Sequence, residues 1–97
     1  MEFEFDPAKS AANRDKHGID FVEAQELWNV PAFDQPSKFG REPRNMRIGK
    51  LGEPIWTAVY TLRGENVRLI SVRRARTEEI ARHDRNIADE SGADQEP

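Results

Sequence analysis

The sequence contains no cysteine, which excludes a disulfide framework, thiol chemistry and any cysteine-based zinc site. Its two histidines, His17 and His83, lie far apart in the chain, and no spacing of histidines or carboxylates typical of a metal site occurs. There is no glycine-rich phosphate loop, and none of the four serines lies in a nucleophile elbow. We therefore expect neither a bound metal nor a cofactor.

Long hydrophobic runs are also missing. Residues 1–20 hold five acidic residues and no apolar run, so we expect no secretory signal, no membrane contact and a cytoplasmic location. The 97 residues are 36% hydrophobic and 34% charged, which is typical of one globular domain with a small core and a strongly charged surface.

Charge is unevenly distributed behind a net charge of −3. Residues 1–37 hold three basic and eight acidic side chains, whereas residues 38–85 hold twelve basic and six acidic ones. A contiguous basic segment suits an anionic partner in spite of the acidic overall balance. Residues 86–97 carry four acidic residues and no basic one. We predict one domain over residues 1–88 and a disordered acidic tail at 89–97.

The N-terminal third has the pattern of a strand and two helices. Apolar and acidic side chains alternate over residues 3–5, which predicts a short strand. Asp6 followed by proline is typical of a helix start, and Gly18 is typical of a helix end. Asp20, with a glutamate three residues later, predicts a capping box at the start of a second helix.

The remaining chain has the pattern of a β-meander followed by a helix. We expect a loop over residues 31–45 that includes a short edge strand at 32–34, then strands at 46–49, 55–62 and 66–76. Thr77 is expected to cap the last helix. The prediction is an α+β domain in which two N-terminal helices and one C-terminal helix pack on one face of a small antiparallel sheet.

The strand expected at 66–76 organises the predicted fold. It is apolar on both faces, as in a strand that lies between two neighbours. Strict alternation places Val67, Leu69 and Ser71 on one face, and Arg68, Ile70 and Val72 on the other. Arginines at 73, 74 and 76 follow the apolar run. Guanidinium groups at a rigid strand end suit phosphate recognition; the alternative is a solvated strand end paired with carboxylates.

Metal-independent RNA cleavage needs a base for the 2′-hydroxyl, cations for the scissile phosphate and an acid for the leaving oxygen. Histidine titrates near neutral pH, so His17 suits either proton-transfer role. Lys9 suits one only if burial or nearby cations favour its neutral form. The structural alternatives are a helix-end histidine and a surface lysine. The arginines that can hold phosphate on the sheet segment are Arg44, Arg47, Arg68, Arg73 and Arg74.

Five stretches carry a resemblance to a known family. They are Phe3 to Lys9, Asn13 with Lys16 to Gly18, Phe21 to Ala24, Arg44 with Ile48 and Gly49, and Arg68 to Ala75. Their order and spacing, over roughly residues 3–84, resemble the BrnT family of type II toxins, which are small ribonucleases with a RelE-like fold.

The resemblance implies a ribonuclease toxin that is neutralised by a ribbon-helix-helix antitoxin of the BrnA type. Operator DNA is then bound only through the antitoxin. Carried over by position, the catalytic candidates are Lys9, His17, Arg44, Arg68 and Arg73. Arg47 and Arg74 are predicted to contact RNA, while Glu79 and His83 are predicted to have supporting roles, with Glu79 orienting an arginine.

Two positions depart from the family pattern. Pro43 stands where the family usually has an acidic residue, and His83 stands where it usually has a tyrosine. His83 either substitutes for that tyrosine or marks a weakened enzyme. Two other functions stay open at this point. One is a non-catalytic toxin-like subunit that binds the antitoxin and modulates its operator binding, and the other is a general nucleic-acid-binding domain.

Overall fold

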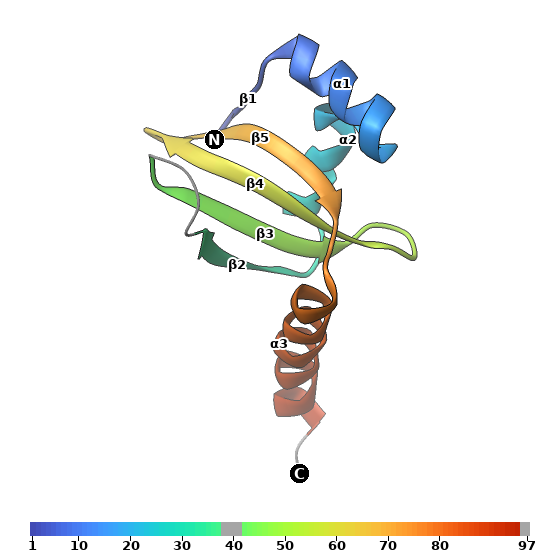
Figure 1. The fold of residues 1–97 in the computed structure, drawn as a ribbon. Helices are drawn as coiled ribbons and strands as arrows, with labels where there is room; N and C mark the ends of the chain where they lie inside the picture. Colours follow the sequence, from blue (N-terminus) through green and yellow to red (C-terminus); the bar gives the residue numbers. More distant parts are fainter. Residues whose placement is uncertain (38–41, 96–97) are drawn as a thin grey trace.

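The computed structural model describes residues 1–37 and 42–95, with side chains described as far as residue 87. The elements, in chain order, are β1 (Phe3–Glu4), α1 (Pro7–His17), α2 (Phe21–Ala24), the 3-10 helix η1 (Gln25–Trp28), β2 (Ala32–Ser37), β3 (Arg44–Lys50), β4 (Ile55–Arg63), β5 (Asn66–Arg74) and α3 (Thr77–Gln95) (Figure 1). The predicted α+β class is confirmed, and the meander strands are present as β3, β4 and β5.

The sheet has the order β1-β5-β4-β3-β2. The strands from β2 to β5 pair antiparallel, but β1 pairs parallel to β5, with Phe3 opposite Val67. The expectation of a purely antiparallel sheet is therefore wrong, and the sheet is mixed. A two-residue strand carries no sequence signal for the direction of its partner, because its periodicity is the same in both arrangements.

Helix α1 begins and ends, and helix α2 begins, as their caps predict. The Asp6 carboxylate accepts a hydrogen bond from the Ala8 N–H at 2.9 Å, and Gly18 ends α1 in the left-handed conformation at φ 82°. Asp20 and Glu23 form the predicted capping box. The second helix is shorter than expected, because α2 has four residues and continues as the 3-10 helix η1.

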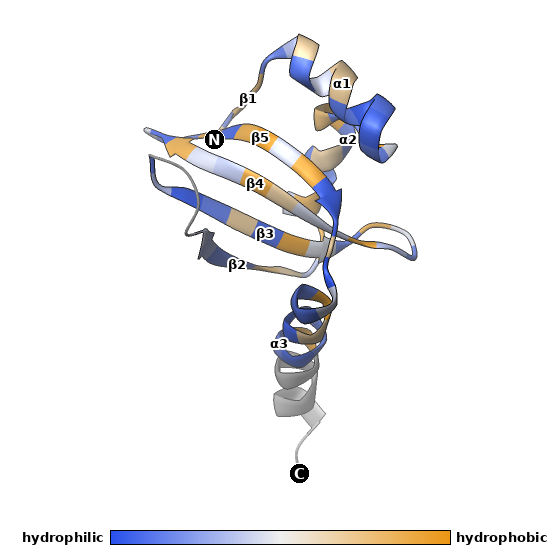
Figure 2. Cartoon of the chain, in the orientation of Figure 1, coloured by the Kyte–Doolittle hydropathy of each residue, from blue (hydrophilic) through white to orange (hydrophobic). Residues whose placement is uncertain are grey.

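The main core lies between these helices and one face of the sheet. Its central buried residues are Phe21, Ala24 and Leu27 from the helices, with Ala58 and Leu69 from β4 and β5. Figure 2 shows the apolar stripes on β4 and β5, whereas β3 and the first turns of α3 are largely hydrophilic. The core is therefore built from one face of the two strands with the strongest β pattern.

A β-bulge interrupts the pairing of β4 with β5. Val59 lies opposite Ser71 and Tyr60 opposite Leu69, so Ile70 is an extra residue in β5. The expected strict alternation is therefore wrong beyond Leu69. Val72 and not Ser71 joins Val67 and Leu69 in the core. As a consequence, Ser71 and the residue two places later, Arg73, point to the face opposite the core.

Where β1 no longer pairs with β5, an asparagine side chain hydrogen-bonds to the backbone of β5. Asn13 in α1 donates its amide to the Val72 carbonyl at 2.9 Å, and its Oδ1 accepts from the Val72 N–H at 3.2 Å. The same amide donates to the Ile19 carbonyl at 2.8 Å. β5 therefore lies between β4 and β1, as predicted, and Asn13 continues its hydrogen bonding where β1 ends.

Helix α3 does not share the face of α1 and α2. Its residue Glu79 accepts a hydrogen bond from the Thr57 hydroxyl, which alternates in β4 with the core residue Ala58. The helix contacts β2 and β3 and then projects away from the sheet (Figure 1). The expectation that all helices pack on one sheet face is therefore wrong. A helix with a thin apolar stripe has no strong preference for a face, and polar contacts hold this one in place.

The predicted boundary between domain and tail, at residue 88, lies just beyond the last described side chain, that of residue 87. The backbone of α3 reaches Gln95, and residues 96–97 lie outside the described part. The division into a domain and a tail at 89–97 therefore stays a prediction. Among the helices described, none has the length and apolar character needed to cross a membrane.

Candidate functional site

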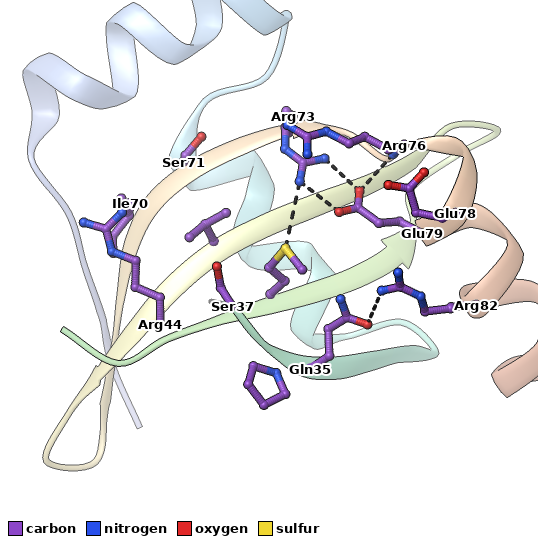
Figure 3. Close-up of a pocket in the computed structure, with 13 residues that line it drawn as sticks. Gln35, Ser37, Arg44, Ile70, Ser71, Arg73, Arg76, Glu78, Glu79 and Arg82 are labelled. Atoms are coloured by element: carbon purple, nitrogen blue, oxygen red, sulfur yellow. Dashed lines mark hydrogen bonds and ion pairs between the residues drawn. The ribbon is translucent and has the colours of Figure 1, made fainter. Parts of the chain in front are cut away.

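A cleft of about 610 Å³ lies on the sheet face opposite α1 and α2, between β2–β5 and the start of α3 (Figure 3). Its middle is one cross-strand row, in which Gln35, Met46, Val59 and Ser71 pair in sequence. The row is polar at its two ends and apolar in its middle. Pro36 and Ile70 line the cleft beside it.

Arginines stand at both ends of this cleft. Arg44 lies at the start of β3, two residues before the middle row, while Arg73 lies two residues beyond that row on β5. Measured parallel to the strands, the four residue spacings between Arg44 and Arg73 correspond to about 13 Å. Arg76, just before α3, and Arg82, in the second turn of α3, lie on the Arg73 side (Figure 3). An extended anionic chain therefore meets positive charge on both sides of an apolar floor.

Arg73 forms a buried bidentate ion pair with Glu79. Its Nη1 donates to Oε1 at 2.7 Å and its Nη2 to Oε2 at 2.9 Å. The side chains of Arg73 and Glu79 are only 19% and 5% exposed. The Thr57 hydroxyl at 2.9 Å and the Arg76 backbone N–H at 2.8 Å also donate to this carboxylate. The ion pair therefore links the end of β5 to the first turn of α3.

The electrostatics of the pair follow from these contacts. Burial by itself raises the pKa of Glu79, but the hydrogen bonds from Arg73, Arg76 and Thr57 together lower that pKa to about 2. The hydrogen bond to Glu79 raises the pKa of Arg73 above its ordinary value in spite of burial. Both groups stay charged at every physiological pH. Arg73 is thus a fixed donor in the cleft and not a group that transfers protons.

Arg44 has a different environment. Its Nε is buried and has no hydrogen-bond partner among residues 1–37 and 42–95. A buried donor without an acceptor costs about 1–3 kcal/mol. An oxygen atom of a ligand in the cleft would remove that cost. The side chain of Arg76 likewise makes no ion pair within the described chain.

The structure brings three of the predicted site residues together, namely Arg44, Arg73 and Glu79. Arg68 does not line the cleft and pairs with Glu4 at 3.7 Å. Lys9 is exposed on α1, and His17 is half-buried at the end of that helix. Neither lines the cleft. The proton-transfer candidates are therefore separated from the arginines of the cleft.

His83 is buried one turn beyond Glu79 in α3, with 6% of its surface exposed. Its Nδ1 lies 3.1 Å from a carboxylate oxygen of Asp84, and the ring does not line the cleft. The supporting role of His83 therefore stays a prediction.

Arg47 and Arg74 lie on the face of the sheet that carries the core. Arg47 donates to Asp34 at 2.7 Å and to the Leu27 carbonyl at 2.8 Å, and its guanidinium lies 5.2 Å from the centre of the Trp28 ring. Arg74 lies 5.1 Å over the Trp56 ring. The structure therefore places both predicted RNA contacts on tryptophans, away from the cleft.

Some residues that line the cleft were not predicted. They include Gln35, Ser71, Glu78 and Arg82. Ser71 was assigned to the core face by strict alternation, but the bulge at Ile70 turns it to the cleft face. Arg82 joins the cleft because α3 packs over β2, where its Nη1 donates to the Gln35 side-chain oxygen at 2.9 Å. A local pattern does not contain that contact, because the two residues lie 47 positions apart.

These features define an α+β domain with an arginine-lined cleft, and arginine is the side chain best suited to fixed phosphate contacts. Residues 5–79 match the model of a family described as ribonuclease toxin, BrnT, of type II toxin–antitoxin system. The chain belongs to this family, which confirms the resemblance seen in the sequence. A search of curated proteins found no match.

Membership in this family makes the chain a ribonuclease toxin of a type II toxin–antitoxin system, with an antitoxin as its partner. Likeness to the RelE-like fold stays a prediction. In the described part of the chain, no group of three or more histidine, aspartate or glutamate side chains could hold a metal ion.

Proposed function

We propose that the chain is a metal-independent endoribonuclease that binds RNA in the arginine-lined cleft and cleaves it there. The observation that carries the proposal is the cleft itself, with Arg44 at one end and Arg73 and Arg76 at the other. The buried Nε of Arg44, which lacks an acceptor in the described structure, supports an anionic ligand at that end.

In this proposal the arginines hold and polarise the phosphate that is cleaved. Glu79 occupies two of the N–H donors of Arg73 and fixes the guanidinium, so Glu79 is a positioning residue. A donor that is fixed before the substrate binds costs no reorganisation when charge develops on the phosphate oxygens. Arg44 and Arg76, which have no carboxylate partner within the described chain, supply uncompensated positive charge.

Proton transfer requires a further group. Glu78 is an exposed carboxylate that lines the cleft, and it is a candidate base beside the predicted Lys9 and His17. Lys9, His17 and Arg68 keep their proposed catalytic roles only if bound RNA reaches beyond the cleft to α1 and the start of β5. Separate alanine variants of Glu78, Lys9 and His17 distinguish these routes by the pH dependence of cleavage.

The test is cleavage of RNA by the purified chain in the presence of a metal chelator. We expect cleavage by the natural chain and its loss in Arg44→Ala. Arg74→Ala is a matched control, since it removes an arginine from the other face. Cleavage that is abolished by the chelator and restored by magnesium would contradict metal independence.

A second function is favoured by one observation, which is that neither histidine lines the cleft. In that case the chain is a non-catalytic toxin-like subunit that binds the antitoxin and modulates its binding to operator DNA. Absence of growth arrest on expression, or RNA left intact at high protein concentration, would favour this function.

We further propose that the antitoxin is a ribbon-helix-helix protein of the BrnA type, and that it covers the basic segment of residues 38–85. The basic excess over residues 38–85 supports this, because opposite charge favours docking and would exclude RNA from the same surface. Hydrogen exchange on the complex should show protection in β3–β5. Protection confined to α1 and α2 would contradict this arrangement.

A further inference from the structure

The middle row of the cleft has the features of a nucleobase subsite, and this inference rests on the proposed function. Its floor is formed by Met46 and Val59, whose side chains give a surface on which a flat base can lie. Gln35 and Ser71 stand at the two ends of the same row. Arginines flank the row along the strands on both sides.

The orientation of the Gln35 amide is determined by its neighbour. Arg82 donates from Nη1 to the Gln35 Oε1 at 2.9 Å. An arginine has donors only, so the oxygen of the amide must face Arg82 and its NH2 group must face away. Figure 3 shows that NH2 group directed toward the cleft. Within the described chain it donates to no acceptor.

The arginines around the row are also donors, whereas the carboxylates of Glu78 and Glu79 accept and the hydroxyls of Ser37 and Ser71 can do either, so the selectivity argued here is that of the Gln35 end of the row. Arg73 and Arg76 stand on one side and Arg44 on the other. A base that presents a carbonyl oxygen to Gln35 forms a hydrogen bond, whereas an exocyclic amino group in the same place faces another donor. Guanine carries O6 and uracil carries O4 as acceptors, but adenine and cytosine carry amino groups at the corresponding positions.

We propose that the Gln35–Arg82 pair makes this cleft selective for a keto base, guanine or uracil, bound over Met46 and Val59 with its two flanking phosphates at the two arginine ends. Gln35 is then a specificity-determining residue, and Arg82 is a positioning residue that acts through it. The chemical class of the ligand is a nucleoside with a phosphate on each side.

The decisive variant is Gln35→Glu. A glutamate keeps an oxygen for Arg82 and therefore keeps the link between β2 and α3, but it presents an acceptor to the cleft in place of a donor. The preference should then move toward adenine and cytosine. Gln25→Glu is the matched control, because it makes the same chemical change in η1.

Two measurements test the proposal. The first maps cleavage sites in a random-sequence RNA, where the natural chain should favour guanine or uracil at one position by about tenfold, and Gln35→Glu should lose or invert that preference. The second measures binding of the four nucleoside 3′,5′-bisphosphates. Those of guanine and uracil should bind the natural chain about tenfold more tightly, and Gln35→Glu should reverse this order.

These outcomes separate the two proposals. RNA cleavage with no base preference, or with a preference that Gln35→Glu leaves unchanged, overturns the base-selective site while the ribonuclease proposal stands. Selective binding of bisphosphates without RNA cleavage supports the site and overturns the catalytic proposal. Equal binding of all four bisphosphates overturns the site whether or not RNA is cleaved.

Discussion

The two faces of the sheet use arginine in opposite ways. On the face that carries the core, Arg47 and Arg74 stack on tryptophans, and Arg47 is further held by Asp34 and a backbone carbonyl. On the cleft face, Arg44 has a buried nitrogen with no acceptor in the described chain. The comparison shows that a basic segment is not one surface. Alternation along two strands divides it into arginines that stabilise the fold and arginines that face a ligand.

Arg73 combines both uses, because it lines the cleft and is also buried in an ion pair. On the other face, the Tyr60 hydroxyl is likewise partly buried and hydrogen-bonded to a carboxylate. Burial and the hydrogen bond to Asp34 raise the pKa of Tyr60 above its ordinary value, so it also keeps one protonation state. Four predictions test how far the two faces differ, from the largest expected effect to the smallest.

The largest effect is expected from Glu79→Ala. It leaves the guanidinium of Arg73 buried without its partner, and breaking a buried pair in this way costs about 3–5 kcal/mol of unfolding free energy. Asp34→Ala, which removes the partner of Arg47 on the other face, should cost no more than about 2 kcal/mol, because Asp34 is 40% exposed. Chemical denaturation measures both, and equal costs would contradict the distinction between the faces.

A second effect concerns the stability of the fold at low pH. The folded pKa of Glu79 lies at about 2, below its ordinary value of 4.5. The stability that this group contributes is therefore fully present above pH 4.5 and is lost as the pH falls through 2. The loss amounts to roughly 3 kcal/mol, and Glu79→Gln should not show it. Unfolding free energies of both proteins between pH 5 and 2 give the difference, and parallel curves would show that Glu79 does not carry the acid sensitivity.

A third effect separates Arg44 from Arg47. Arg44→Ala should slow RNA cleavage about 100-fold, the usual effect of removing one fixed donor from a transition state, while leaving stability unchanged or slightly raised. Arg47→Ala should leave cleavage intact and lower the unfolding free energy by about 1–2 kcal/mol. Rates of RNA cleavage with denaturation curves for both variants form the test. Loss of stability in Arg44→Ala together with loss of cleavage in Arg47→Ala would contradict the assignment of the two faces.

The smallest effect is expected from Arg74→Ala. Its exposed guanidinium contacts the Trp56 ring, a contact worth about 0.5–1 kcal/mol at most. Cleavage should be unchanged within about twofold. A strong loss of cleavage with a normal melting temperature would instead place RNA on the core face, in agreement with the role predicted from the sequence.

Much of the fold was predictable because its signals are local. The caps at Asp6, Gly18 and Asp20 act within a few residues, and the β-branched residues of β4 favour a strand in any context. The direction of β1 and the face of α3 were not predictable. Each depends on a partner distant in the chain, and neither segment is apolar enough to favour one arrangement.

Most of the secondary structure, the family and the arginine cluster at the end of β5 could be predicted from the amino-acid sequence. Only the tertiary structure decided which arginines meet. One extra residue, Ile70, in the pairing of β5 with β4 reverses the faces of all residues beyond it. Without that bulge, Arg73 would share the face of Val67 and Leu69, and Arg74 would point to the cleft. A one-residue shift moves side chains across the sheet because they alternate with a period of two.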